Sequence, residues 1–219
     1  MTNIPAINSF HSCVRTLERP LVYAELWGLH QRMGADFPML PLSYHSNQAG
    51  MMFTPDPPLV IKVGSAEAGY GKIKCDSREQ LQDVRSLIAL HSDFVTVERY
   101  VEGREYDIRI QVVGERLRSF HRRSTVGSWK GNVGSCALEE VDISLYPQYT
   151  KWAEAVRPIC GGLDIYTVDA IHCDNGKELI LEINDSASGF SADNMKEDMG
   201  HCAELTLEKL ANVRKTKTG

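Results

Sequence analysis

The chain has 219 residues, of which 42% are hydrophobic and 24% are charged. This composition is typical of a globular protein and excludes collagen, coiled coil and disorder as descriptions of the whole chain. Lysine and arginine number 24 against 29 acidic residues, so the net charge is -5. Nonspecific nucleic-acid binding depends on a basic surface, so we expect no nucleic-acid partner.

The six cysteines show neither CxxC spacing nor a zinc-ligand pattern, which predicts reduced thiols and a cytosolic setting. No run of 18 apolar residues is present, and the N-terminal stretch lacks the apolar segment of a signal peptide. These features predict a cytoplasmic protein.

Two helices are predicted near the N-terminus. Asn8 or Ser9 can cap a short first helix. Pro20 suits the first turn of a second helix, and Gly34 suits its C-terminal cap. The segment 37–44 contains two prolines and is expected to be an edge strand or an extended stretch.

The rest of the chain mixes strands, hairpins and helices. Ser77 with Gln80 predicts a capped helix, and Gly114-Glu115 predicts a hairpin turn. The expected strands are 59–63, 72–75, 94–101, 106–113 and 116–121, and the expected helices are 77–91, 149–159 and 195–213. This irregular alternation favours an α+β fold over a doubly wound parallel sheet.

An acidic hairpin is predicted between residues 163 and 184. Asn175-Gly176 indicates a two-residue type I′ turn, in which the numbers of paired residues sum to 351. Asp169 then lies opposite Glu182, and Asn184 shares their face because side chains alternate with period two. The opposite, core-facing side would carry Val168, Ala170, Leu181 and Ile183.

Two carboxylates directly across a ladder repel each other unless a cation lies between them. Mg²⁺ and Ca²⁺ prefer such oxygen clusters, and Asn184 can add a neutral oxygen. The alternative is a solvated outer face with Lys177 nearby. The hairpin alone leaves both interpretations open.

The second candidate feature is a glycine-rich loop at 64–72, with the sequence GSAEAGYGK. It is not a P-loop, because Lys72 is followed by a strand-like stretch instead of a helix. A glycine-rich hairpin loop can still cover phosphates, since its backbone N–H groups approach anions closely. Lys62 and Lys72 flank this loop and could point toward the same phosphates. The alternative is a surface hairpin with two solvated lysines.

Cationic and polar groups recur after the loop, namely Arg109, Arg122, Arg123, Lys130 and Asn132. Cations for a polyphosphate, followed by oxygens for its metal ion, are what a nucleotide site needs. This order resembles the ATP-grasp superfamily, and more closely the nucleotide-binding part of synapsins. The matching stretches are IPAINSFHS, VIKVGSAEAGYGKIK, VERYVEGREYDIRIQ, SWKGNVGSCALE, GGLDIYTVDAIH and ELILEIND.

The resemblance covers about residues 4–210 and implies an ATP-grasp fold, with nucleotide held between two α+β lobes. The small lobe would span about 51–101 and the large lobe about 102–213, with N-terminal helices within 8–34. Synapsins carry an α/β domain before this region, and this chain is expected to lack most or all of it.

The resemblance also implies roles for individual residues in binding ATP. Lys62 and Lys72 would contact the phosphates beneath a covering loop that contains Gly69 and Gly71. Two further cations would lie near the phosphates, Arg109 and Lys130.

The hinge between the lobes would hold the adenine through backbone groups of Glu98, Arg99, Tyr100 and Val101. Glu105 would reach the ribose. Asp169 and Glu182 would bind Mg²⁺ or Ca²⁺ with help from Asn184. The hairpin pattern independently indicates the same three residues.

By resemblance, the expected function is synapsin-like: ATP binding with a divalent metal, in a protein of the cytosolic face of synaptic vesicles that regulates neurotransmitter release. ATP would act as a structural or regulatory ligand, with peripheral association with the vesicle membrane and a homo-oligomer as further expectations.

Two alternatives remain. Asp169 and the EIN sequence at 182–184 look closer to catalytic ATP-grasp ligases than many synapsins do, so a carboxylate–amine ligase acting through an acyl phosphate is one alternative. The other is a scaffold with a decayed site, against which the retained lysines and acids argue.

Overall fold

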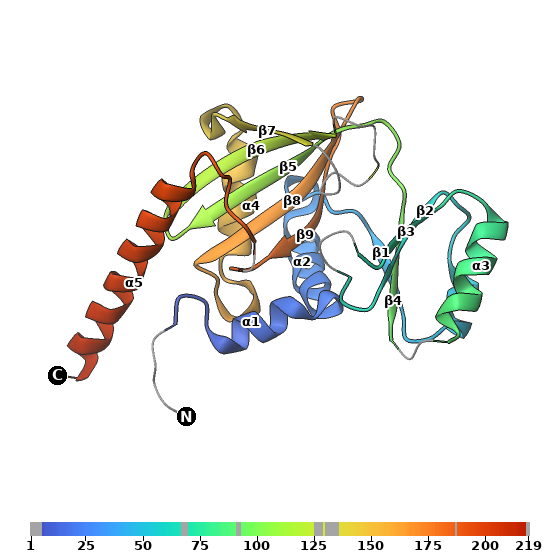
Figure 1. Ribbon diagram of the computed structural model, residues 1–219, viewed down its shortest axis with the longest axis horizontal. Helices are drawn as coiled ribbons and strands as arrows, with labels where there is room; N and C mark the ends of the chain where they lie inside the picture. Colours follow the sequence, from blue (N-terminus) through green and yellow to red (C-terminus); the bar gives the residue numbers. More distant parts are fainter. Residues whose placement is uncertain are drawn as a thin grey trace.

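The computed structural model describes residues 6–66, 70–90, 93–124, 129, 136–186 and 188–217. Within these residues the chain forms two antiparallel sheets, one of four strands and one of five (Figure 1). Helices pack against both sheets, which confirms the predicted α+β class.

The smaller sheet has the strand order β1-β4-β2-β3. Its strands are β1 (Leu42–His45), β2 (Leu59–Val63), β3 (Lys72–Cys75) and β4 (Val95–Arg99), and its helix is α3 (Arg78–Ile88). The bounds of β2 and β3 agree with the prediction because prolines and glycines delimit them. β1 lies at the edge of this sheet although it precedes residue 51. Ser77 caps α3 by accepting a hydrogen bond from the Gln80 N–H.

The larger sheet has the order β7-β6-β5-β8-β9. Its strands are β5 (Arg104–Val113), β6 (Arg116–Ser124), β7 (Cys136–Val141), β8 (Ile165–Cys173) and β9 (Glu178–Asn184). The predicted hairpin of β5 and β6 is confirmed, with Val113 paired to Arg116 across Gly114-Glu115. Side chains alternate along β5, so Ile108 and Ile110 are buried while Asp107 and Arg109 lie on the opposite face.

The remaining helices are α1 (Phe10–Leu17), α2 (Arg19–Met33), α4 (Pro147–Val156) and α5 (Met195–Lys217), with short 3₁₀ helices η1 (Gly34–Asp36), η2 (Ala49–Phe53), η3 (Ile143–Leu145) and η4 (Ile159–Gly161). α2 and α4 pack on the large sheet around Trp152, which is 2% exposed. α4 begins and ends earlier than predicted because Pro147 starts it and Pro158 interrupts it.

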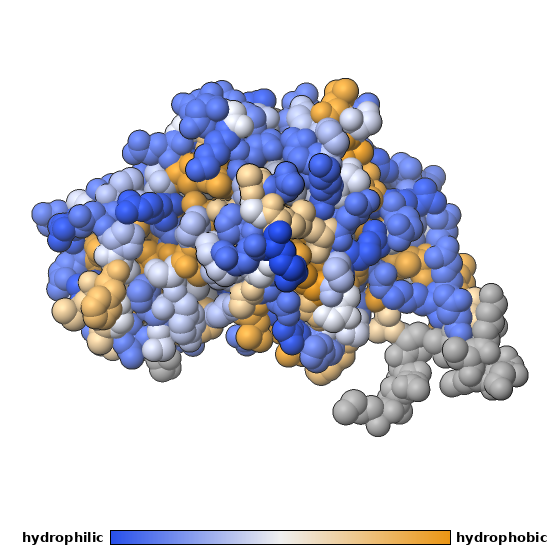
Figure 2. Space-filling model, turned by 180° about the vertical axis from the view of Figure 1, so that it is seen from behind, coloured by the Kyte–Doolittle hydropathy of each residue, from blue (hydrophilic) through white to orange (hydrophobic). Residues whose placement is uncertain are grey.

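The helix α5 is anchored near its first turn and then extends past the sheet (Figure 1). The buried Asp198 carboxylate accepts hydrogen bonds from Gln111 and from Arg118, at 2.7 and 2.9 Å. Seen from behind, the surface is mostly hydrophilic, with apolar side chains in separate patches (Figure 2). No helix in the described part of the chain has the length and apolar character needed to cross a membrane.

The β8–β9 hairpin confirms the predicted pairing of Asp169 with Glu182, but the predicted turn type is wrong. The turn is not a two-residue turn: Cys173 bonds to Lys177 around a three-residue loop, so pairs near the turn sum to 350. A β-bulge at Leu181 then restores the predicted register, because Ala170 pairs with Ile180 and Asp169 with Glu182. The bulge also turns Leu181 away from the core-facing side predicted for it and into the cleft, where it packs against the buried cluster of Leu40, Ile171, Cys173 and Leu179.

The N-terminal segment is tied to β8 by one buried side chain. Asn8 donates from Nδ2 to the Ile165 carbonyl at 2.6 Å, and its Oδ1 accepts from the Asp164 and Ile165 N–H groups. We therefore expect Asn8→Ala to lower the free energy of unfolding, measured in urea, by about 2–3 kcal/mol. Asn47→Ala, which removes one exposed hydrogen bond, should cost less than about 1 kcal/mol. Equal losses in the two variants would contradict this assignment.

Candidate functional site

A cleft lies between the two sheets, next to the connection from β4 to β5. Its walls come from both sheets: Lys62 and Lys72 from the smaller, Asp169 and Glu182 from the larger. The larger sheet contributes this face because β8 and β9 direct their other side chains into the core. The fold therefore brings together cations and carboxylates that are up to 120 residues apart in the sequence.

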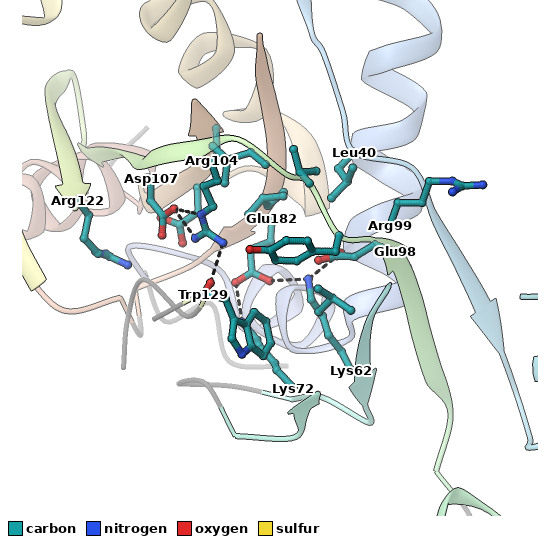
Figure 3. Close-up of a pocket in the computed structure, with 17 residues that line it drawn as sticks. Leu40, Lys62, Lys72, Glu98, Arg99, Arg104, Asp107, Arg122, Trp129 and Glu182 are labelled. Carbon is teal, nitrogen blue, oxygen red and sulfur yellow. Dashed lines mark hydrogen bonds and ion pairs between the residues drawn. The ribbon is translucent and has the colours of Figure 1, made fainter. Parts of the chain in front are cut away.

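Lys62 is the buried centre of the cleft. It is 4% exposed, and its Nζ lies 2.8 Å from Glu98 Oε2 and 3.9 Å from Glu182 Oε2 (Figure 3). β2 and β4 pair directly, which places Lys62 and Glu98 on one face of the sheet. A lysine this buried needs a carboxylate partner, because an isolated charge away from water is unstable.

Three cations converge on the Glu182 carboxylate. Arg19 Nη1 lies 2.5 Å from Oε2, Lys72 Nζ lies 3.5 Å from Oε1, and Lys62 is the third. Burial by itself would raise the pKa of Glu182, but the two lysines and Arg19 hold it well below its usual range. Burial also lowers the pKa of the Lys72 amine, an effect that Glu182 opposes. The carboxylate is thus ionised and surrounded by an excess of positive charge.

Asp169 lies beside this cluster on β8. Arg109 Nε is 3.6 Å from its Oδ1, and Asn184 Nδ2 donates to its Oδ2 at 2.8 Å. Burial raises the pKa of Asp169 although Arg109 lowers it, so the carboxylate lacks full compensation by cations. The three residues predicted from the hairpin therefore lie together on one face.

The other end of the cleft is apolar. Leu40, Val60, Ile171 and Leu181 line it, next to the four residues predicted as the hinge, Glu98, Arg99, Tyr100 and Val101. The Arg99 side chain points away from the charged cluster (Figure 3). The Tyr100 N–H already donates to the Pro58 carbonyl at 3.0 Å. The slot thus combines apolar walls with the backbone of a short connection between the sheets.

Several other predicted residues lie elsewhere or outside the described part. Glu105 is not among the described residues that line the cleft, and its carboxylate is 3.9 Å from His172 Nε2. Gly71 has a φ of 66°, and its carbonyl accepts from the Val63 N–H at the base of the loop. Gly69 and Lys130 lie outside the described residues.

Sequence reasoning missed Arg19 entirely and left Arg104 and Asp107 without a role. Arg104 Nε donates to Asp107 Oδ1 at 2.5 Å, and its Nη1 donates to the Trp129 carbonyl at 3.1 Å (Figure 3). Asp107 alternates with buried residues along β5, and that signal could have placed it on the cleft face. Arg19 offered no local signal, because it is simply the first residue of α2.

A second cavity, of about 550 Å³, continues from the charged end of the cleft. It shares Lys72, Asp169 and Glu182 with the cleft and is further lined by Thr16 and Ser188. Its volume lies within the range of small-molecule sites. The charged cluster therefore lies where the two hollows meet.

Comparison with known proteins agrees with this geometry. Residues 8–212 match the family model described as "Synapsin, ATP binding domain". The chain is 28% identical to Drosophila melanogaster synapsin over 215 residues, which is 96% of this chain and 21% of that protein. It is 29% identical over 168 residues to a probable alpha-L-glutamate ligase of Pseudomonas savastanoi pv. phaseolicola, covering 74% of this chain and 54% of the ligase.

Solved structures support the fold. The D-alanine–D-alanine ligase of Bacillus anthracis superposes with a TM-score of 0.68 at 16% identity, covering 98% of this chain and 74% of that one. The chain spans about a fifth of the fly synapsin and about half of the bacterial ligase it matches. The fold is that of ATP-grasp proteins, and the chain belongs to the family of synapsin ATP-binding domains.

Proposed function

We propose that the cleft binds ATP together with a divalent metal ion. The adenine lies in the apolar slot against residues 98–101, and the phosphates lie toward Lys62, Lys72 and Arg109. The convergence of three cations on Glu182 supports this most strongly, because such an excess of positive charge suits a polyphosphate. By resemblance, Gly69 and Lys130 complete the phosphate side.

The donor set fits a hard metal ion such as Mg²⁺ or Ca²⁺. Asp169 and Glu182 offer carboxylate oxygens on neighbouring strands, and Asn184 can offer its amide oxygen. Over the described residues, however, no group of three or more His, Cys, Asp and Glu side chains is placed to hold a metal. Mg²⁺ is commonly held by one or two carboxylates plus substrate phosphates, so the protein's ligands suffice only with the nucleotide. The bound ion would neutralise phosphate charge.

At the level of the whole protein, we propose a regulatory role. ATP would draw a small lobe of about 51–101 and a large lobe of about 102–213 together, and so stabilise the closed form. The synapsin relationship suggests association with synaptic vesicles, control of neurotransmitter release and assembly into homo-oligomers. Flotation with vesicles and light scattering, each with and without ATP, test the vesicle and assembly proposals.

An ATP-grasp ligase is the second candidate, favoured by the second cavity, which continues from the charged cluster and could hold a further substrate, and by Asp169. A carboxylate oxygen of the substrate would attack the γ-phosphorus, giving ADP and an acyl phosphate. An amine would then attack the acyl carbon and release inorganic phosphate. Lys72 and Arg109 would stabilise the transferred charge. ADP formation stimulated by an amino acid or a peptide would support this activity, and flat turnover across such a panel would count against it.

Calorimetry tests the ATP-binding proposal. We expect ATP to bind at least about tenfold more tightly with Mg²⁺ or Ca²⁺ than with a chelator, because the carboxylates and the phosphates share the ion. In Glu182→Ala, and in Glu182→Gln of nearly equal size, this metal-dependent gain should disappear.

The matched control is Glu204→Gln, an exposed carboxylate that pairs with Arg116 far from the cleft, and it should keep the gain. No ATP binding by the unaltered protein in any condition would overturn the proposal and favour a decayed site.

A further inference from the structure

Arg19 connects three parts of the molecule at the charged end of the cleft. It begins α2, its Nη1 lies 2.5 Å from Glu182 Oε2, and its Nη2 donates to the Ala66 carbonyl at 2.7 Å. The side chain is 14% exposed. One guanidinium therefore ties an N-terminal helix and the start of the glycine-rich loop to the proposed metal carboxylate.

This arrangement is incompatible with a metal ion on the same oxygen. Arg19 occupies Glu182 Oε2 at hydrogen-bond distance, and Lys62 and Lys72 add two further positive charges within 4 Å of the carboxylate. A divalent cation approaching Glu182 would meet three cations. Glu98 balances only Lys62, and Asp169 already lies beside Arg109, so repulsion from Arg19 and Lys72 opposes metal binding.

A polyphosphate changes this balance. Its negative oxygens offer new partners to Arg19 and to both lysines, and a planar guanidinium suits such oxygens particularly well. Once these cations turn toward phosphate, the Glu182 oxygens are available to a metal ion. The Ala66 carbonyl loses its contact with Arg19 at the same time.

We propose that Arg19 is a positioning residue that keeps the metal site closed and the glycine-rich loop tethered until a nucleotide arrives. This inference rests on the proposed binding of ATP with a metal ion. The new element is the role of Arg19, a residue of helix α2, which makes metal binding depend on the nucleotide. Arg19 would then exchange Glu182 and Ala66 for a phosphate group.

The test measures Mn²⁺ binding, in place of Mg²⁺, with and without a non-hydrolysable ATP analogue. Electron paramagnetic resonance of free Mn²⁺ reports the affinity without any turnover. The unaltered protein should bind Mn²⁺ weakly alone and at least about 100-fold more tightly with the analogue. Arg19→Gln should bind Mn²⁺ alone at least about tenfold more tightly than the unaltered protein does, so that the gain on adding the analogue shrinks.

A second measurement separates the two roles of Arg19, namely keeping a metal ion from Glu182 and holding the Ala66 carbonyl. Arg19→Lys keeps a positive charge near Glu182 but lacks the fork that reaches Ala66 at the same time. It should keep the Mn²⁺ behaviour of the unaltered protein, while hydrogen exchange in the segment 59–75 becomes faster without nucleotide. Arg15→Gln is the matched control, because Arg15 pairs with Glu25 on the neighbouring helices and, among the described residues, forms no ion pair with Glu182.

The two possible failures are distinguishable. If the unaltered protein binds the analogue with Mn²⁺ and Arg19→Gln shows the same weak binding of Mn²⁺ alone, this inference is wrong while the proposed function stands. If the unaltered protein binds neither, the proposed function falls and the inference falls with it. Should Arg19→Gln fail to fold by circular dichroism, Arg19→Lys carries the test, and unchanged loop exchange in it overturns the proposal.

Discussion

Replacing Lys62 with methionine is expected to lower the free energy of unfolding by about 3–5 kcal/mol, measured in urea without nucleotide. The side chains of Lys62 and Glu98 are 5% and 9% exposed and lie 2.8 Å apart. The variant leaves Glu98 as a buried carboxylate without its main partner. The loss therefore reflects an uncompensated buried charge more than the loss of one attractive contact.

The double variant Lys62→Met, Glu98→Leu provides the control. It replaces the buried pair with apolar side chains of similar volume, an exchange that is often neutral for stability. We expect it to regain most of the lost stability but not the ATP binding, because the lysine proposed to face the phosphates is still absent. A double variant as unstable as Lys62→Met alone would show that the orphaned carboxylate is not the cause.

Replacing Lys72 with methionine is expected to weaken ATP binding about 100-fold, because a charge-assisted contact to phosphate contributes roughly 1.5–3 kcal/mol. The Lys72 side chain is 15% exposed and reaches Glu182 from the end of the glycine-rich loop. Calorimetry with Mg²⁺ measures the effect. Arg78→Met serves as the control. Arg78 begins helix α3 and forms an exposed ion pair with Asp56, so this variant should leave the affinity for ATP unchanged. Equal affinities for the unaltered protein and Lys72→Met would remove Lys72 from the site.

The lowered pKa of the Lys72 amine makes the expected affinity for ATP depend on pH. Burial lowers the pKa of its amine below the ordinary value of 10.5, so the charge is lost at a lower pH than in a solvated lysine. In the proposed complex ATP contacts the protonated amine, so the affinity for ATP should fall as the pH rises through the alkaline range toward 10.5. Lys72→Arg should flatten this decline, because a guanidinium stays charged there. An identical decline in Lys72→Arg would assign the titration to another group.

The hairpin of β8 and β9 shows how far sequence patterns reach. Its pairing followed from the Asn175-Gly176 signal, yet the real turn is one residue longer and the bulge at Leu181 compensates for it. The pairing of Asp169 with Glu182 was thus correct through two offsetting departures. Alternation predicted the faces on either side of the bulge, but nothing in the local sequence distinguishes a bulged leucine from a core leucine.

The cleft shows the limit of the same reasoning. Lys62 and Lys72 could be selected because they flank a glycine-rich loop, and their order along the chain indicated phosphate chemistry. The contact of Arg19 with Glu182 spans 163 positions and depends on how α2 packs against the large sheet, which no spacing rule encodes. Glu105 was assigned by resemblance, and the structure places it against His172 because the strand irregularity between residues 104 and 106 breaks the simple alternation.

The bulge at Leu181 has an evolutionary consequence. A bulged strand carries one residue more than its partner, so an insertion or deletion at this point leaves Asp169 opposite Glu182. The side chain at 181 faces the apolar slot, whereas its neighbour at 182 faces the cations. In the proposed ATP complex, selection can therefore reshape the wall of the adenine slot at position 181, in both length and identity, without disturbing the carboxylates at 169 and 182. If the cleft binds ATP and a metal ion as proposed, nucleobase preference and metal binding can in this way evolve as separate traits on adjacent residues.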